Sequence, residues 1–258
     1  MALNFENQGV PLAYIKNSKS KKTPVISVCE KIEEVRKPFN EFNLNEETPE
    51  QYQLIPNMEK EREVVYITGQ SGSGKSWFCK SFCDEYKRAY PKRDIYLFSS
   101  LKGDLGSIDQ IKGGVKRIKL EKDLLTEDIT AEDFKNSMVI FDDVDCLTDK
   151  LMKNKVQGIL NSILETGRHF NVSCCYTSHL PCKGNETKTI LNEAHHIVFF
   201  PATLGGRSLK YLLDSYLGLD KQQIRKIKKL KSRWVCISKT FPQVCLSEKE
   251  CFLTKSVE

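Results

Sequence analysis

The sequence predicts an α/β fold in which a central, mostly parallel sheet is flanked by helices. From Glu63 onward, short apolar runs alternate with longer amphipathic runs, the pattern of strands and helices in turn. A glycine-rich stretch, GQSGSGKS at 69–76, joins the first apolar run to the first amphipathic one. The 258 residues are enough to bury one sizeable core. We therefore expect one main domain with appendages.

Six apolar runs are the candidate strands, because each is short, rich in β-branched or aromatic side chains and bounded by polar residues. The run at 137–143 reads as fully buried, whereas the one at 115–120 is short and carries alternating lysines. In chain order the runs are EVVYITG (63–69), DIYLFSS (94–100), VKRIKL (115–120), SMVIFDD (137–143), VSCCYTS (172–178) and HIVFFP (196–201).

The helices are predicted by amphipathic spacing and by stop signals. One runs from Lys75 to about Tyr90, where Pro91 ends it. The next spans 150–167, with apolar residues at helical spacing. After Pro201 the pattern favours helices at 208–216 and 221–230, followed by a hairpin of RWVCIS and QVCLS turned around Phe241-Pro242.

These elements divide the chain into three parts. Residues 1–60 read as an N-terminal arm with one candidate strand, TPVISVCE. Residues 61–205 form the α/β core, and residues 206–258 supply basic helices and a hairpin packed on that core. No function is legible in the arm.

Composition indicates a soluble, intracellular chain that is not secreted. Apolar residues make up 40% and charged residues 29%, no apolar run reaches membrane-spanning length, and the start lacks a secretion signal. The ten cysteines fall in apolar runs, which favours reduced core thiols. Cys79 and Cys83, or His179 and Cys182, lack a second pair at zinc-finger spacing, so the pattern predicts no structural zinc.

The stretch GQSGSGKS matches the full P-loop pattern, with a strand before it and a helix after it. Glycines and small residues let successive backbone N–H groups turn toward phosphate oxygens at the positive end of a helix. Lys75 would reach the outer phosphates of ATP, and the Ser76 hydroxyl would ligate Mg²⁺. The predicted nucleotide-binding residues are Gly69, Gln70, Ser71, Gly72, Ser73, Gly74, Lys75, Ser76 and Trp77.

Two adjacent acids follow the buried run MVIFDD. Magnesium wants a carboxylate at the end of a neighbouring strand, so Asp142 is the predicted metal ligand beside Ser76. Asp143 would orient or deprotonate the attacking water, although a capping role, or competition from Asp145, is the alternative.

The next apolar run ends in YTSH, which puts a polar residue beside the terminal phosphate. Thr177, Ser178 and His179 are the candidates, and Thr177 is the predicted catalytic residue. A strand-end cap is the alternative for each of them.

Several P-loop classes lack support in the sequence. The guanine-reading Asn-Lys-x-Asp is absent, because Asn154-Lys155 is followed by Val156 and Gln157. The stretch TLGGRS only echoes a transporter signature and follows the acid pair instead of preceding it. A small-molecule kinase stays open, as does a nucleotide-gated assembly factor without turnover.

The motifs GQSGSGKS and MVIFDD, with ETGRHFNVSCCYTSH and LKSRWVCISKTFPQV, resemble those of the genome-packaging ATPases of nucleocytoplasmic large DNA viruses. These belong to the FtsK-HerA superfamily of DNA-pumping motors. The resemblance covers about residues 60–248 and implies a P-loop fold of the RecA/FtsK-HerA type. That superfamily usually has glutamate where this chain has Asp143.

The resemblance also implies partners. Such motors work as homo-oligomeric rings, commonly hexamers, in which an arginine before the fourth strand reaches the neighbour's nucleotide. Arg168 occupies that position, with Arg207 and Arg233 as rivals.

A basic run near the C-terminus is the candidate surface for double-stranded DNA. The stretch 220–233 carries seven basic residues against one acidic, and lysines can hold phosphates without reading sequence. A solvated helix face, or a surface for capsid or inner-membrane proteins of the virion, is the alternative. The expected function is packaging of a viral genome, in the host cytoplasm or the virion.

Overall fold

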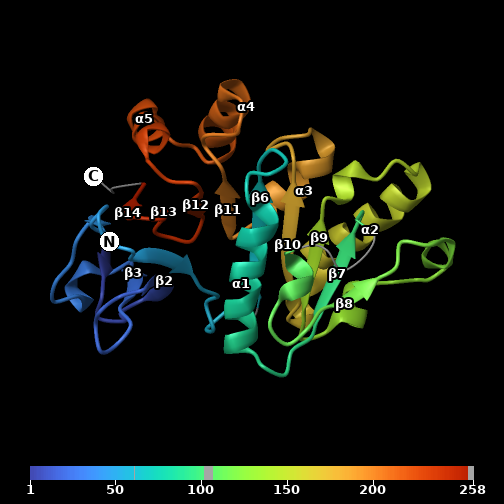
Figure 1. The fold of residues 1–258 in the computed structure, drawn as a ribbon, viewed down its shortest axis with the longest axis horizontal. Helices are drawn as coiled ribbons and strands as arrows, with labels where there is room; N and C mark the ends of the chain where they lie inside the picture. The colour runs from blue at the N-terminus through green and yellow to red at the C-terminus, as the bar shows by residue number, and fades with distance from the viewer. Residues whose placement is uncertain (61, 102–106, 255–258) are drawn as a thin grey trace. The chain divides into compact units, whose positions relative to one another are not determined.

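The computed structural model describes residues 1–60, 62–101 and 107–254 (Figure 1). The chain forms two compact units. One, here called the P-loop unit, is Met58–Ala194; the other, the terminal unit, combines Met1–Asn57 with His195–Glu258.

The P-loop unit contains a parallel sheet. Its strands are β6 (Val64–Thr68), β7 (Ile95–Ser99), β8 (Lys116–Ile118), β9 (Met138–Asp142) and β10 (Ser173–Ser178), in the order β6-β10-β9-β7-β8. Every neighbouring pair is parallel. Strands β6, β9 and β10 are buried along their whole length, as expected where helices cover both faces. The predicted α/β class and its strands are confirmed.

Helices connect these strands. They are α1 (Lys75–Ala89), α2 (Lys150–Thr166) and α3 (Asn185–Glu193). Because crossovers between parallel strands are right-handed, α1 covers one face of the sheet while α2 and α3 cover the other (Figure 1). Short 3-10 turns complete the unit: η2 (Ile108–Gln110), η3 (Lys122–Leu125), η4 (Ala131–Phe134), η5 (Val144–Cys146) and η6 (Gly167–Phe170). Helix α3 was not predicted, because its first turns are polar.

The end of α2 is held by a buried arginine. Arg62 donates hydrogen bonds from Nη1 to Ile163 O (2.7 Å) and from Nη2 to Leu164 O (2.8 Å). These bonds reach two of the last carbonyls of the helix, of which Ile163 O also accepts from the Gly167 N–H. A Cβ at Gly167 would approach Arg62 Nη1 to 3.2 Å and Val172 Cβ to 3.3 Å, so a larger residue would crowd both side chains.

The terminal unit contains two antiparallel groups of strands. The first has the order β1-β3-β2-β5, formed by β1 (Ala2–Asn4), β2 (Val10–Lys16), β3 (Val25–Cys29) and β5 (Gln51–Leu54). The second joins β4 (Glu41–Asn43), β14 (Glu250–Leu253), β13 (Val244–Ser247), β12 (Val235–Ser238) and β11 (His196–Phe199), each paired antiparallel with the next. Residues from both ends of the chain therefore share one sheet.

The N-terminal part is richer in strands than the sequence indicated. The predicted strand is β3, but residues 1–57 also contain β1, β2, β4 and β5 and the turn η1 (Ile32–Glu34). These strands are short, and β4 pairs with β14 from the other end of the chain. Local periodicity could not reveal them, because their stability depends on distant partners.

The C-terminal part agrees with the sequence except for β14. Helix α4 (Gly206–Tyr211) continues into a π-helical turn, η7 (Leu212–Tyr216), and α5 (Lys221–Lys229) follows. Asp220 caps α5 by accepting hydrogen bonds from Gln222 N and Gln223 N. Strands β12 and β13 form the predicted hairpin, with a cis Phe241-Pro242 bond in its turn. Within the described ranges, we find no helix with the length and hydropathy needed to span a bilayer.

Candidate active site

The P-loop joins β6 to α1, as the sequence predicts. Gly72 and Gly74 adopt positive φ values of 75° and 113°, which favour glycine at both positions. Lys75 begins α1, is 5% exposed, and donates a 3.3 Å hydrogen bond from Nζ to Gln70 O. The Gly69 N–H donates to Ser178 O (3.1 Å), so the loop is tied to the end of β10. Successive N–H groups at a helix start can bind phosphate.

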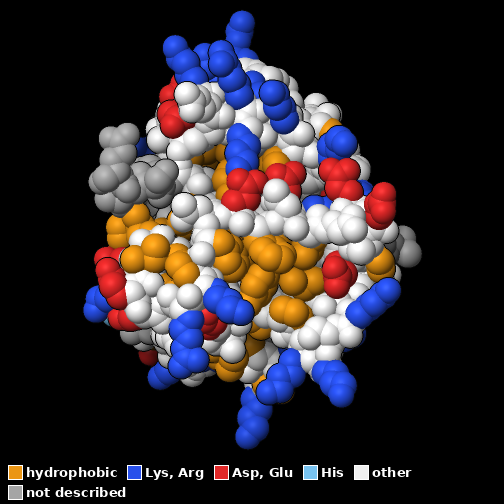
Figure 2. Space-filling view, turned by 90° about the vertical axis from the view of Figure 1, so that its left-hand side faces the viewer, with side chains coloured by type: hydrophobic (Ala, Val, Ile, Leu, Met, Phe, Trp, Pro, Cys, Tyr) orange, Lys and Arg blue, Asp and Glu red, His pale blue; other side chains and the backbone are white. Residues whose placement is uncertain are grey.

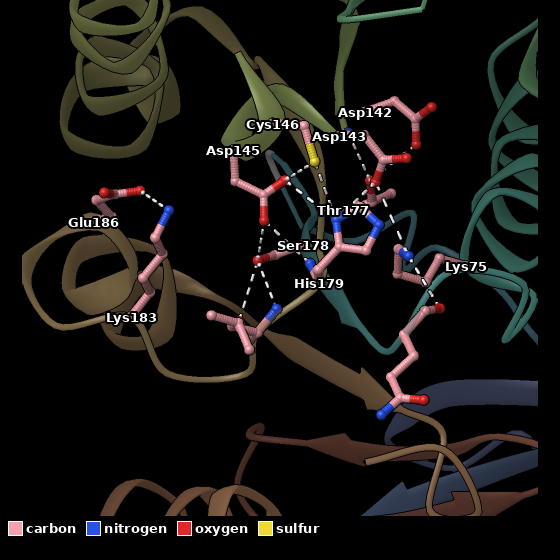
Figure 3. A network of polar contacts seen from close by, with 12 residues as sticks. Lys75, Asp142, Asp143, Asp145, Cys146, Thr177, Ser178, His179, Lys183 and Glu186 are labelled. Atoms are coloured by element: carbon pink, nitrogen blue, oxygen red, sulfur yellow. Dashed lines mark hydrogen bonds and ion pairs between the residues drawn. The ribbon is translucent and has the colours of Figure 1, made fainter. Parts of the chain in front are cut away.

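The two predicted acids lie directly beside this loop (Figure 3). Asp142 is the last residue of β9 and is 5% exposed. Asp143 follows in the left-handed region, at φ 51° and ψ 29°, which turns the chain sharply after the strand. Its Oδ1 lies 3.9 Å from Lys75 Nζ. The loop lysine and the acid pair are therefore close enough to act on one phosphate group.

Thr177 connects the two acids from the neighbouring strand. Its Oγ1 donates to Asp142 Oδ1 (2.8 Å) and accepts from the Asp143 N–H (3.0 Å). Oγ1 also lies 3.4 Å from Asp143 Oδ1. The Thr177 side chain is fully buried, so these bonds have no water to replace them. This residue holds the acid pair in place.

Electrostatics make the acid pair a suitable cation site. Burial raises the pKa of Asp142 to about 7, and the negative charge of Asp143 adds to this rise, while the Thr177 hydrogen bond and Lys75 lower it. A divalent cation would relieve the repulsion between the two carboxylates. Ser76 and Asp142 line one pocket, and hydroxyl and carboxylate oxygens are ligands that Mg²⁺ prefers. The residues present fit that ion.

The same pocket contains residues that the sequence did not predict. Asp109 and Arg117 line it with Ser99. Arg117 Nη2 contacts both Asp109 oxygens, at 2.7 and 2.8 Å, which fixes the guanidinium. No local motif marks either residue, because they meet only when η2 and β8 are placed in the fold.

His179, another candidate at the end of β10, lies close to Asp143 and Asp145. Its Nδ1 lies 3.7 Å from Asp143 Oδ1 and 3.6 Å from Asp145 Oδ1. Ser178 Oγ instead donates to Asp145 Oδ2 (3.1 Å). Asp145 thus orients the residues after β10, while Asp143 faces Lys75.

The predicted finger residue is remote from the P-loop of its own chain. Arg168 is exposed and lies in η6, before the amino end of β10, whereas the P-loop follows the carboxyl end of β6. Strands β6 and β10 run parallel, with Ser178 opposite Thr68. Arg168 and the P-loop therefore lie at opposite ends of these strands. Arg207 and Arg233 belong to the terminal unit. Trp77, on the first turn of α1, is 54% exposed.

Comparison with solved structures supports the fold. The cytoplasmic domain of the type VII secretion ATPase EccC from Thermomonospora curvata is 12% identical, with a TM-score of 0.50, over 84% of this chain and 29% of that chain. This likeness shows a shared P-loop ATPase fold.

Two further structures are less similar in fold. The genome-packaging NTPase B204 of Sulfolobus turreted icosahedral virus 2, in complex with ATP-gammaS, is 14% identical, with a TM-score of 0.46 over 73% of this chain and 97% of that one. The conjugation coupling protein TcpA of pCW3 is 11% identical, with a TM-score of 0.49 over 93% and 75%.

Comparison with curated sequences identifies a relative. Protein V3 of Sputnik virophage is 42% identical over 185 residues, which cover 70% of this chain and 73% of V3. No protein-family profile matches the chain. At this identity and coverage the kinship is clear: the chain belongs to the same protein family as V3 of Sputnik virophage.

Proposed function

We propose that this protein is an ATPase that hydrolyses ATP to move double-stranded DNA into a viral capsid. The observation that carries hydrolysis is the contact of Lys75 with Asp143, next to Asp142 and bridged to it by Thr177. A protein that only stores a nucleotide needs the phosphate cradle but no second acid. An adjacent acid can orient or deprotonate water.

Each residue has a defined role in this proposal. The P-loop N–H groups and Lys75 bind the phosphates, and Ser76 and Asp142 would hold Mg²⁺, which when bound would supply positive charge beside the transferred phosphoryl group. Asp143 positions the water. The Thr177 hydroxyl positions the Asp142 carboxylate relative to the Asp143 backbone N–H.

The place of Arg168 supports a proposal that sites are shared between subunits. It cannot serve the P-loop of its own chain from the opposite edge of the sheet. In a closed ring, however, an exposed arginine at that edge can face the neighbour's nucleotide and stabilise the developing charge. We propose this role for Arg168 in a homo-oligomeric ring.

The DNA-binding surface in this proposal is the exposed side of α5, defined here as the α5 basic face: Lys221, Arg225, Lys228 and Lys229. Ile224 and Ile227 are buried on the opposite side of the helix. Lys226 is occupied within its own unit, because its Nζ contacts Glu41 Oε2 (2.5 Å) and lies 3.9 Å from the centre of the Phe252 ring. Figure 2 shows Lys and Arg side chains gathered at the top of its view.

The packaging role rests on the motif resemblance, and the viral relative is consistent with it. Packaging would place the protein in the host cytoplasm or the virion. Capsid or inner-membrane proteins are the expected further partners.

The test is ATP hydrolysis measured with and without double-stranded DNA, at several protein concentrations. We expect DNA to stimulate phosphate release, and the stimulation to increase as the protein oligomerises. A rate of ATP hydrolysis that DNA does not change at low salt would reject the proposal of a DNA-translocating motor. Transfer of labelled phosphate from ATP to a nucleotide or a sugar, in the absence of DNA, would favour the small-molecule kinase. ATP binding with no turnover in any condition would favour a nucleotide-gated assembly factor.

A further inference from the structure

Beside the acid pair lie three side chains of the types that bind zinc-like cations: a thiol, an imidazole and a carboxylate. Asp145 and Cys146 lie in η5, which follows β9, and His179 follows β10. Cys146 Sγ lies 3.4 Å from His179 Nδ1 and 3.8 Å from Asp145 Oδ1, and the remaining distance, Nδ1 to Oδ1, is 3.6 Å (Figure 3). One thiol, one imidazole and one carboxylate thus converge, and their ligand atoms lie within 4.8 Å of one another.

The triangle has the size of one face of a tetrahedral zinc site. Bonds of about 2.3 Å to sulfur and about 2.0–2.2 Å to nitrogen and oxygen, at tetrahedral angles, separate the ligand atoms by about 3.4–3.6 Å. The three observed distances lie within a few tenths of an ångström of these values. We propose that Asp145, Cys146 and His179 form a binding site for a thiophilic divalent cation of the zinc class, with water as fourth ligand.

The ligand chemistry separates this site from the proposed Mg²⁺ site. Magnesium takes oxygen ligands in near-octahedral geometry, which a thiolate and an imidazole do not supply. Zinc accepts sulfur, nitrogen and oxygen in tetrahedral geometry. Two different cations can therefore bind near each other.

Surrounding hydrogen bonds orient the carboxylate as a ligand. Asp145 Oδ2 accepts from Ser178 Oγ and from the His179 N–H, each at 3.1 Å. These bonds occupy one oxygen and leave Oδ1 facing Cys146 and His179. Such outer-shell bonds fix the orientation of metal ligands. The Asp145 side chain is only 6% exposed, whereas Cys146 is exposed and gives a cation access from solvent.

One atom, His179 Nδ1, lies close both to the proposed zinc ligands and to Asp143 of the proposed nucleotide site. His179 Nδ1, a ligand in this proposal, also lies 3.7 Å from Asp143 Oδ1, which lies 3.9 Å from Lys75 Nζ. A dication bound to Nδ1 would place two positive charges near the proposed water-positioning acid. We expect bound zinc to slow ATP hydrolysis. This expectation rests on the proposed function, whereas the binding site itself does not.

A second cluster must be distinguished in the test. Cys79 and Cys83 on α1 and Cys175 on β10 also bring three ligand atoms together, but all three side chains are buried in the core. The cluster has no carboxylate or imidazole among its members. A zinc-loaded protein alone would not tell the two clusters apart.

The experiment titrates the reduced, full-length protein with Co²⁺, which substitutes for zinc and gives a thiolate-to-metal absorption band. The variants are Cys146→Ser and His179→Gln in the proposed site, Cys182→Ser as a partly exposed cysteine outside it, and Cys83→Ala in the buried cluster. Thermal unfolding confirms that each variant is folded. Zinc then competes with the bound Co²⁺ in the same cuvette.

We expect one Co²⁺ per chain with a thiolate band in the wild type, in Cys182→Ser and in Cys83→Ala. Cys146→Ser should lose the band, and both Cys146→Ser and His179→Gln should bind at least about tenfold more weakly, because a ligand is gone. A wild type without the band overturns the proposal. So does a band that persists in Cys146→Ser or disappears in Cys83→Ala alone.

Phosphate release with added Zn²⁺ tests the coupling. We expect zinc to inhibit the wild type and to inhibit Cys146→Ser much less, with equal activity of the two proteins when a zinc-selective chelator is added and Mg²⁺ is kept in excess. Zinc binding without inhibition would uphold the site and overturn its influence on hydrolysis. If the zinc-free wild type hydrolyses no ATP in the presence of Mg²⁺, the proposed function fails, and the Co²⁺ titration still decides the site.

Discussion

The Thr177 hydroxyl donates a 2.8 Å hydrogen bond to Asp142 Oδ1, which joins the ends of two neighbouring parallel strands. The same oxygen accepts from the Asp143 N–H at 3.0 Å. One buried hydroxyl therefore sets the positions of both acids. The arrangement of the site depends on β10 as much as on β9.

Thr177→Val should weaken both stability and hydrolysis. Valine has nearly the same shape but leaves the buried Asp142 carboxylate and the partly buried Asp143 N–H without this partner, which costs about 1–3 kcal/mol of unfolding free energy. Denaturant unfolding and phosphate release measure the two effects.

Two variants separate the role of the Thr177 hydroxyl from a general loss of stability. Thr177→Ser keeps the hydroxyl and should restore most of the activity. Thr187 is also buried, and its Oγ1 accepts from Lys183 N (2.8 Å), away from the acids. Thr187→Val should therefore cost stability without a comparable loss of turnover; equal losses in the two valine variants would contradict the bridging role.

Lys75→Ala should abolish ATP hydrolysis. The lysine is the P-loop cation that would reach the outer phosphates, and its Nζ lies 3.9 Å from Asp143 Oδ1. Lys80→Ala is the matched control, because Lys80 lies on the same helix and pairs with Asp84 at 2.7 Å. Turnover by Lys75→Ala near the rate of Lys80→Ala would exclude the P-loop role.

Asp143→Asn should separate binding from hydrolysis. The amide keeps the shape of the side chain but cannot take a proton, so we expect turnover to fall by about 10²–10⁴-fold while ATP still binds. Fluorescent-nucleotide titration and phosphate release give the two quantities. Asp94→Asn, which removes an exposed ion pair with Lys116, should change neither. If Asp143→Asn keeps full turnover and Asp145→Asn does not, the water-positioning role belongs to Asp145.

The sequence predicted the parts of the site that lie in contiguous segments. Phosphate binding needs consecutive N–H groups, so Gly69 to Ser76 form a readable motif, and a buried strand followed by two acids is equally local. It could not predict that Arg117 meets Asp109, or that Cys146 meets His179, because these contacts join segments separated in the chain. Most short strands of residues 1–57 were not predicted for the same reason.

Arg168→Ala tests whether sites are shared between subunits. Alone, this variant should retain ATP binding and lose most hydrolysis, because the neighbour's phosphoryl charge is no longer neutralised. Mixed with Lys75→Ala, it should regain part of the activity, since one subunit supplies the arginine and the other an intact P-loop. No recovery at any mixing ratio would argue against a finger acting between subunits. Arg88→Ala, which removes an exposed arginine paired with Glu85, should behave as wild type.

The α5 basic face should govern the salt dependence of DNA binding. Replacing Arg225, Lys228 and Lys229 with alanine removes exposed charges without touching the buried Ile224 and Ile227. If all three residues contact phosphates, the slope of log affinity against log salt should become shallower by about 0.9 per contact. Fluorescence anisotropy with a short random-sequence duplex measures the slope.

The matched control replaces Lys19, Lys21 and Lys22, which are exposed in the stretch between β2 and β3, and removes the same net charge. Counterion release is local to the phosphates that a protein covers, so this control should leave the slope near that of the wild type if α5 makes the contacts. Equal slopes in the two triple variants would mean that net charge alone attracts the DNA. An unchanged slope in the α5 variant would assign binding to another surface of the protein.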